Sequence, residues 1–237
     1  MSTHTQPRGV TQRVGRCPGV PLTYWAAMTF DGIPLAALDF YEGLEADNSK
    51  TYWTEHKGVY ESSVRGPITA LCEQLAPEFG DVHFFRPHRD LRFSPDKRPY
   101  KEHQGATVGS HYFHVDASGL FVATGYYQMR PDQVARYREA VDDGKTGPAL
   151  ETIVTTIRSD GYEIGGDQLK TKPRGYDADH PRIELLRHKA LVTWRTFGAP
   201  DWLPTSDAAE HIATTWREMT PLHAWLDNHV GPPREQS

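Results

Sequence analysis

The chain has 237 residues, of which 38% are hydrophobic, and its formal net charge is −5. This length favours one large domain, and six tryptophans among 11% aromatic residues are enough to build a core. Two cysteines are too few for a disulfide framework or a thiolate zinc site, and no apolar run approaches the roughly 20 residues that span a bilayer. The composition therefore favours a soluble protein with no membrane partner. Because no apolar signal segment opens the chain, we expect it to be cytoplasmic.

The first 29 residues differ in composition from the rest of the chain. They are polar, are interrupted by Pro and Gly, and carry three arginines without an acidic residue. Such a segment offers too little apolar surface to fold by itself, which predicts a disordered N-terminal extension over residues 1–29. Residues 30–230 are then expected to form the single domain.

Apolar residues at helical spacing occur on both sides of a β-rich centre. The third predicted helix carries Ile68, Leu71, Cys72 and Leu75 on one stripe, so Cys72 is interpreted as a core residue rather than a nucleophile. The helices are expected to begin near Pro34, Ser49, Gly66, Pro131, Pro148, Pro181 and Asp207.

Aromatic and β-branched residues fill the segments 82–85, 106–115, 120–127 and 190–194. The two longest of these flank the four-residue turn 116–119, which predicts an antiparallel hairpin. Helices before and after a group of strands indicate an α+β fold, in which helices pack on one face of an antiparallel sheet.

A loop rich in basic residues lies between the first strand and the hairpin. Residues 86–101 hold six basic residues against two acidic ones, and three prolines exclude a continuous helix. A proline-stiffened loop with this charge, presented by a rigid scaffold, indicates an anionic partner. The basic residues are Arg86, Arg89, Arg92, Lys97, Arg98 and Lys101.

A second basic stretch runs from Lys170 to Lys189. It contains the sequence KPRGY at 172–176, where Gly175 would let the backbone approach a ligand and Tyr176 could stack or donate a hydrogen bond. The two stretches together hold 12 of the 26 basic residues. Positive clusters on an otherwise acidic chain favour a pocket for a small anion over a broad nucleic-acid surface.

The residues from Arg89 to Lys101, RDLRFSPDKRPYK, resemble the signature RDxRFSxDKxPYK of an uncharacterised bacterial family known as domain of unknown function 2461. The resemblance implies one fold unit from about Phe30 to the last helix and gives weight to these residues, but it supplies no activity. The family usually has Asn-Asn where this chain has Asp47-Asn48. Further matches occur, in order, at FDG 30–32, DN 47–48, Trp53, PRGYD 173–177, HP 180–181 and ELL 184–186.

We predict that the two basic stretches converge in one cleft and bind a small phosphate- or carboxylate-bearing metabolite. Arginine offers a planar fork for such anions, and lysine adds a mobile point charge. Lys97 and Lys101 are expected to keep their charges solvated, whereas Arg92 is expected to be wedged into the fold. The predicted ligand-binding residues are Arg89, Arg92, Lys97, Tyr100, Lys101, Arg174 and Tyr176.

Two other interpretations stay open. Asp90 and Asp96 could neutralise part of the loop, which would give a non-catalytic structural or interaction protein. Alternatively, Phe93, Tyr100 and Tyr176 could stack on bases in a nucleic-acid-binding module, although the net negative charge argues against this interpretation.

Common enzyme motifs are absent from the sequence. It has no Walker loop, GxSxG elbow or HExxH motif, and GYEIGG at 161–166 lacks dinucleotide-binding spacing, so we expect no cofactor. We expect no metal site either, because His111 and His114 are three residues apart on a predicted strand and would lie on opposite faces. Whether the protein is an enzyme stays open. The acid–base candidates near the basic loops are His88, His103, Asp96 and Tyr100.

Overall fold

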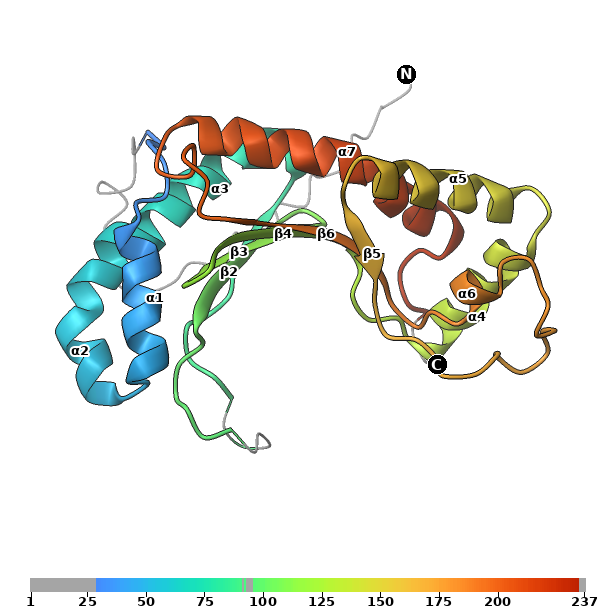
Figure 1. Ribbon diagram of the computed structural model, residues 1–237, viewed down its shortest axis with the longest axis horizontal. Helices are drawn as coiled ribbons and strands as arrows, with labels where there is room; N and C mark the ends of the chain where they lie inside the picture. Colours follow the sequence, from blue (N-terminus) through green and yellow to red (C-terminus); the bar gives the residue numbers. More distant parts are fainter. Residues whose placement is uncertain (1–28, 91, 93–95, 235–237) are drawn as a thin grey trace, which may run out of the picture.

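The computed structural model describes residues 29–90, 92 and 96–234. The predicted disordered extension, apart from Thr29, and Phe93 therefore lie outside the described residues. Figure 1 shows the elements, which in chain order are α1 (Ala36–Ala46), α2 (Lys50–Val59), the π-helical segment η1 (Tyr60–Arg65), α3 (Gly66–Phe79), β1 (Val82–Phe84), β2 (His103–Val108), β3 (His111–Asp116), β4 (Gly119–Tyr126), α4 (Pro131–Asp142), α5 (Thr146–Ser159), β5 (Glu163–Gly165), α6 (Ile183–Leu186), β6 (Leu191–Gly198) and α7 (Asp207–His229).

Six strands form one antiparallel sheet in the order β1-β2-β3-β4-β6-β5. The predicted hairpin is its centre. An Asp116 carboxylate oxygen accepts hydrogen bonds from the backbone N–H groups of Ser118 (2.8 Å) and Gly119 (3.1 Å), which closes the turn between β3 and β4. Gly119 has φ +119°, and a Cβ there would lie 2.0 Å from the carbonyl oxygen of Gly198, so this turn requires glycine.

The two faces of the sheet have different neighbours. Along β3, buried and half-buried residues alternate, so Phe113 and Val115 point to one face while Tyr112 and His114 point to the other. Helices α1, α3 and α7 contact the sheet, and Figure 1 shows them all on its convex side. The predicted α+β class, a single domain with helices on an antiparallel sheet, is confirmed.

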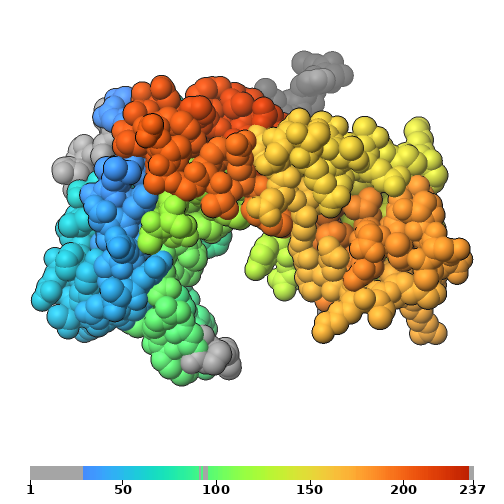
Figure 2. All heavy atoms as spheres, in the orientation of Figure 1, coloured from blue at the N-terminus to red at the C-terminus, as the bar shows by residue number. Residues whose placement is uncertain are grey.

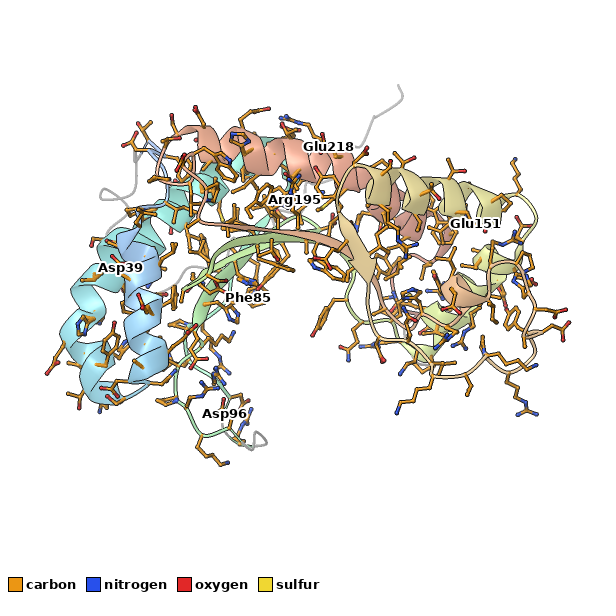
Figure 3. The ribbon with its side chains drawn as sticks, in the orientation of Figure 1. Asp39, Phe85, Asp96, Glu151, Arg195 and Glu218 are labelled. Carbon is orange, nitrogen blue, oxygen red and sulfur yellow. The ribbon has the colours of Figure 1, made fainter. Side chains whose placement is uncertain are left out.

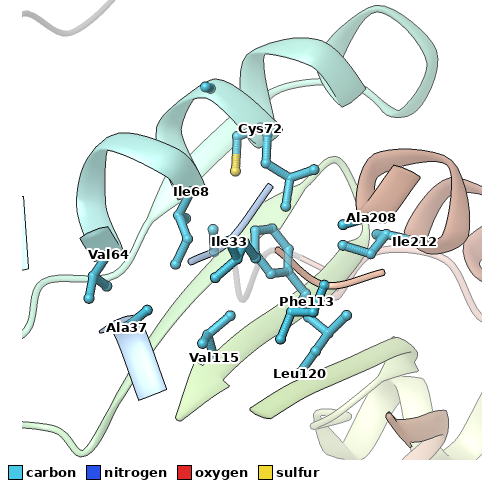
Figure 4. Close-up of a cluster of buried hydrophobic side chains, with 14 of the residues drawn as sticks. Ile33, Ala37, Val64, Ile68, Cys72, Phe113, Val115, Leu120, Ala208 and Ile212 are labelled. Carbon is cyan, nitrogen blue, oxygen red and sulfur yellow. The ribbon is translucent and has the colours of Figure 1, made fainter. Parts of the chain in front are cut away.

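The larger hydrophobic cluster fills the space between the sheet and these helices (Figure 4). Phe113, Val115 and Leu120 rise from the strands toward Ile68 of α3, and all four side chains are fully buried. Cys72 is buried in the same cluster, as its place on the apolar stripe predicted, and burial raises the pKa of its thiol to about 12.

A second cluster lies at the other end of the sheet, among α4, α5, α6 and the last part of α7. Helix α7 has 23 residues and is therefore roughly 34 Å long. Its first half contributes Ile212 and Trp216 to the larger cluster, and its second half contributes Leu222 and Leu226 to the smaller one. The two clusters are thus joined by one helix and by the strands beneath it.

Helix α3 begins at Gly66, as predicted, but the chain stays helical through its junction with the preceding helix. The segment η1 joins them, and the N–H of Gly66 donates to the carbonyl of Glu61 five residues earlier. Pro67 follows at once, and a proline inside an α-helix loses a hydrogen bond and crowds the preceding turn. The wider π turn accommodates that proline. The sequence GP at 66–67 therefore changes the spacing of the backbone hydrogen bonds from four residues to five without ending the helix.

The strand predicted over 106–115 is in fact two strands. Chain reversal occurs at Gly109, whose φ is +56° and where a Cβ would lie 2.0 Å from the carbonyl oxygen of Phe79. Strand β2 begins at His103, two residues after Lys101, the last residue of the signature. Strand β5 was not predicted, and it pairs with β6 at the sheet edge. Both differences arise because a short strand is defined by its partner as much as by its own residues.

The molecule has the shape of an arch (Figures 1 and 2). Helices α1 to α3 form one end, α4 to α6 form the other, and the sheet with α7 forms the span. The loop after β1 descends from the first end, while the loop between β5 and α6 belongs to the second. Figure 2 shows the hollow beneath the span, between the two ends.

Candidate functional site

The signature loop is anchored where it returns to the sheet. The side-chain amide of Asn48 donates to the carbonyl of Tyr100 (3.1 Å), and the N–H of Tyr100 donates back to the Asn48 side-chain oxygen (3.0 Å). The ring of Tyr100 stacks on Trp53 at 4.3 Å between centroids and is 5% exposed. Tyr100 is therefore a core residue at the base of the loop, and its ring faces Trp53 rather than solvent.

Acidic residues neutralise most of the arginines in the loop. Arg89 contacts carboxylate oxygens of both Asp96 and Glu102, and Arg98 contacts the same two carboxylates at 2.8 Å and 2.5 Å. Hydrogen bonds from Arg98 hold the pKa of Asp96 well below its usual range. Two carboxylates thus hold two guanidinium groups in an internal network. Asp96, inside the signature, supplies one carboxylate, and Glu102, which follows the signature, supplies the other.

Arg92 does not occupy the position predicted for it. Its side chain is 76% exposed and pairs with Asp90 at 2.7 Å, so it is not wedged into the fold. Its neighbours Leu91 and Phe93, on which that prediction depended, lie outside the described residues. Arg89, whose side chain is 25% exposed, is the anchored arginine instead. Lys97 is exposed, as predicted.

Lys101 and Arg86 lie at the end of the loop nearest the sheet. The ammonium of Lys101 lies 5.3 Å from the centroid of the Phe85 ring, so this lysine is half-buried rather than fully solvated. Burial, together with Arg86 and Arg89, lowers the pKa of Lys101. Within the described part of the chain, neither Lys101 nor Arg86 has an ion pair. Positive charge therefore remains here, beside the open side of the sheet.

The second basic stretch does not join the first. Figure 1 places the loop that holds Arg174 and Tyr176 at the opposite end of the arch. Arg174 is exposed and lines a separate cavity of about 830 Å³ with Arg138 and Lys189. Tyr176 is half-buried against the second cluster. The predicted convergence of the two stretches in one cleft is therefore wrong, because the sheet holds them apart.

The concave face of the sheet carries rings that no helix of the described residues covers. Phe85 projects from the end of β1 into the hollow (Figure 3), and its ring centroid lies 6.0 Å from that of Tyr112. The ring of His114 stacks on Phe121 at 4.7 Å and lies 5.0 Å from His103. All five side chains are half-buried. They form what we call the ring face, which lies beside Lys101.

A short chain of polar atoms runs across the ring face. The Tyr112 hydroxyl oxygen lies 3.1 Å from Nδ1 of His114, and Nε2 of the same histidine lies 3.5 Å from a carboxylate oxygen of Asp116. Gly105 on β2 makes room for it, because a Cβ there would lie 2.8 Å from the Tyr112 hydroxyl. Alternation along β3 places the three side chains in a row on one face.

The electrostatics of this row fix its protonation at neutral pH. Burial opposes ionisation of Asp116, but hydrogen bonds from His114 and Ser118 outweigh it and lower the carboxyl pKa to about 2. Burial, with Asp116 nearby, raises the pKa of Tyr112 to about 12. Burial, with His114 and Lys101 nearby, lowers the pKa of His103 to about 4. Asp116 is thus charged, while Tyr112 and His103 are neutral.

The row of Tyr112, His114 and Asp116 is not among the residues predicted from the sequence, although the sequence contains its signal. HYFHVD at 111–116 alternates between the two faces, and that alternation was used only to separate His111 from His114. The separation is confirmed: His111 contacts Trp216 on the core side, 5.1 Å between centroids, whereas His114 lies on the ring face. The same alternation predicts that Tyr112, His114 and Asp116, each two residues from the next, share one face of the strand.

The family resemblance seen in the signature extends over most of the chain. Residues 36–225 match the family described as "Conserved hypothetical protein (DUF2461)". The chain belongs to this family. No curated protein matches it. The family description carries no activity, and the matched residues include both the anchored loop and the ring face.

Within the described residues, no helix combines enough length with enough apolar residues to cross a bilayer.

Proposed function

We propose that the ring face binds a small ligand that carries a phosphate or carboxylate group. Lys101 and Arg86 face the anion, and Phe85 and Tyr112 pack against an apolar, flat part of the ligand. The observation that carries the proposal is the position of the Lys101 ammonium, half-buried over Phe85 at the border of the rings. A cation without an ion pair in the described chain, beside half-buried rings, offers both kinds of contact at once.

The internal network modifies the original prediction for the loop. Arg89 holds Asp96 and Glu102, so its role in this proposal is to shape the loop and add positive field rather than to grip the ligand. Arg92 and Lys97 lie on the exposed part of the loop, where they are proposed to attract the anion at longer range. Arg174 and Tyr176 are left out of this site because they lie at the other end of the arch.

The test is a thermal-shift titration with phenyl phosphate and with benzoate, using phenol as the neutral analogue. We expect a rise in melting temperature with at least one of the two anions and none with phenol. A ligand at about 100 times its dissociation constant stabilises by roughly 2.7 kcal/mol, which is easily seen. The two anions distinguish a phosphate site from a carboxylate site.

Lys101→Met removes the charge but keeps an unbranched side chain over Phe85. We expect it to leave the ligand-free melting temperature nearly unchanged and to abolish most of the shift. Lys57→Met is the matched control, because Lys57 is an exposed lysine on α2 and its loss changes the net charge equally. An anion shift that survives Lys101→Met, or that Lys57→Met removes as well, contradicts the proposal.

Single-stranded nucleic acid is the rival ligand, since rings on an open antiparallel sheet can also stack bases. A fluorescent single-stranded oligonucleotide separates the two. Tight binding that weakens steeply with added salt would replace the small-ligand proposal. The net charge of −5 leads us to expect no such binding.

A further inference from the structure

We propose that Tyr112, His114 and Asp116 form a proton relay that activates the Tyr112 hydroxyl as a nucleophile toward an acyl donor. The inference depends on the geometry of the ring face and not on anion binding there. It assigns a reactive atom, the Tyr112 oxygen, to the ring face. The acid–base candidates predicted from the sequence lie in the basic loop or next to it, and none of them belongs to this relay.

The first step is the tautomer of His114. The Asp116 carboxylate faces Nε2 at 3.5 Å, and an ionised carboxylate stabilises a proton on the nitrogen that it faces. Nδ1 is then the nitrogen with a free lone pair, and it lies 3.1 Å from the Tyr112 oxygen. The tyrosine O–H therefore donates to Nδ1. This places a base on the nucleophile and an orienting carboxylate behind the base, which is the arrangement that activates hydroxyl nucleophiles.

The second step is the charge that develops during attack. As the Tyr112 oxygen forms a bond to the acyl carbon, its proton passes to Nδ1 of His114 and the leaving group departs with its electron pair. The new imidazolium lies next to the Asp116 carboxylate, which stabilises it. His103, whose ring lies 5.0 Å away, is neutral at pH 7 and adds no opposing charge.

The surrounding strands and turn hold the three relay residues in place. Phe121 stacks on the His114 ring at 4.7 Å, and Gly105 leaves the space beside the Tyr112 hydroxyl. Asp116 also accepts hydrogen bonds from the turn that follows it, so its carboxylate is fixed. The relay residues are thus placed by strands and a closed turn rather than by a flexible loop.

The experiment uses p-nitrophenyl acetate, an uncharged acyl donor. Release of p-nitrophenolate is followed by absorbance, and peptide mass spectrometry locates the acetyl group. We expect one fast acetylation, at Tyr112, at least ten times faster than at Tyr127, which is 86% exposed and reports ordinary tyrosine reactivity. Tyr112→Phe should remove the fast phase, and Tyr127→Phe should leave it unchanged.

Two variants test the relay itself. His114→Gln should slow acetylation of Tyr112 at least ten-fold. Asp116→Asn keeps an oxygen acceptor for the turn and so preserves the fold, but it removes the charge that orients His114, and a three- to ten-fold loss is expected. Equal reactivity of Tyr112 and Tyr127 overturns the inference, as does wild-type reactivity in Asp116→Asn. Because this probe carries no anionic group, its outcome is independent of the phenyl phosphate titration.

Discussion

Asn48 shows how much of the signature loop depends on one residue outside it. Its side chain bonds both backbone polar groups of Tyr100, whose carbonyl also accepts a hydrogen bond from Nε of Arg89 at 2.8 Å, and its amide also donates to Glu102 at 3.1 Å. The Asp47-Asn48 match to the family therefore has a structural explanation. Asn48 fixes the point at which the loop re-enters the sheet, and that point in turn positions Lys101.

Asn48→Ala should lower the free energy of unfolding by about 2–4 kcal/mol, since it removes three hydrogen bonds worth about 1 kcal/mol each. Urea denaturation measures the loss. Asn228→Ala is the control, because Asn228 is exposed on α7, and its effect should stay within about 0.5 kcal/mol. Equal effects of the two substitutions would show that the loop does not depend on this anchor.

Cys72 offers a second test at the residue scale. Its thiol is buried among apolar side chains, and burial raises its pKa to about 12, so thiolate is scarce at pH 8. We expect iodoacetamide to leave Cys72 unmodified in the folded protein and to modify it in urea, as read by peptide mass spectrometry. Rapid modification without urea would place Cys72 outside the core.

At the scale of elements, four of the five rings of the ring face come from three adjacent strands, and the fifth, Phe85, follows β1. Strand β2 supplies His103 and the space at Gly105, β3 supplies Tyr112 and His114, and β4 supplies Phe121. Antiparallel pairing brings Gly105 directly opposite His114, and His114 directly opposite Phe121. The register between strands therefore decides whether the relay can form.

Gly105→Ala tests this register-dependent fit. The new Cβ would meet the Tyr112 hydroxyl at 2.8 Å, and the ring would have to move away from His114. Because the displaced atom is the end of a side chain, the free energy of unfolding should change by less than about 1.5 kcal/mol. Acetylation of Tyr112 should nevertheless slow at least five-fold. A large loss of stability with unchanged reactivity would contradict the role of Gly105 as the space for the Tyr112 hydroxyl.

At the scale of the whole molecule, two hydrophobic clusters share one sheet and one long helix. Half-buried His103 and buried His111 lie in the sheet, and burial lowers the pKa values of both from the usual 6.5 to about 4. Between these values the unfolded chain binds protons that the folded chain does not, so stability falls as pH falls from about 6.5 to about 4. Asp116 acts in the same direction at lower pH, because its pKa is lowered from 3.8 to about 2.

We therefore expect the urea midpoint to fall steadily between pH 7 and pH 4. Burial also lowers the pKa values of His188 and His223, so His103→Gln removes one of several contributing histidines and should make that fall shallower without abolishing it. The comparison requires full urea curves at pH 7, 5.5 and 4 for both proteins. A midpoint that does not change with pH in the wild type, or an equally steep fall in the variant, would contradict this assignment of the pH dependence.

The sequence by itself determined the features that depend on local spacing. Helical stripes placed Cys72 in the core, the turn after Asp116 defined the hairpin, and alternation separated His111 from His114. These features follow from periods of 3.6 and 2 residues and from turn chemistry, which neighbouring residues are sufficient to express.

Tertiary structure alone decided which charges stay available and which face stays open. Glu102 and Asn48 complete the hydrogen-bond network of the loop, although neither belongs to the signature. Asn48 lies 52 residues before Tyr100 in the chain. The second basic stretch lies across the arch because the strand order places it there. Alternation shows that a strand has two faces, but helix packing decides which face is covered, and that depends on contacts between residues far apart in the sequence.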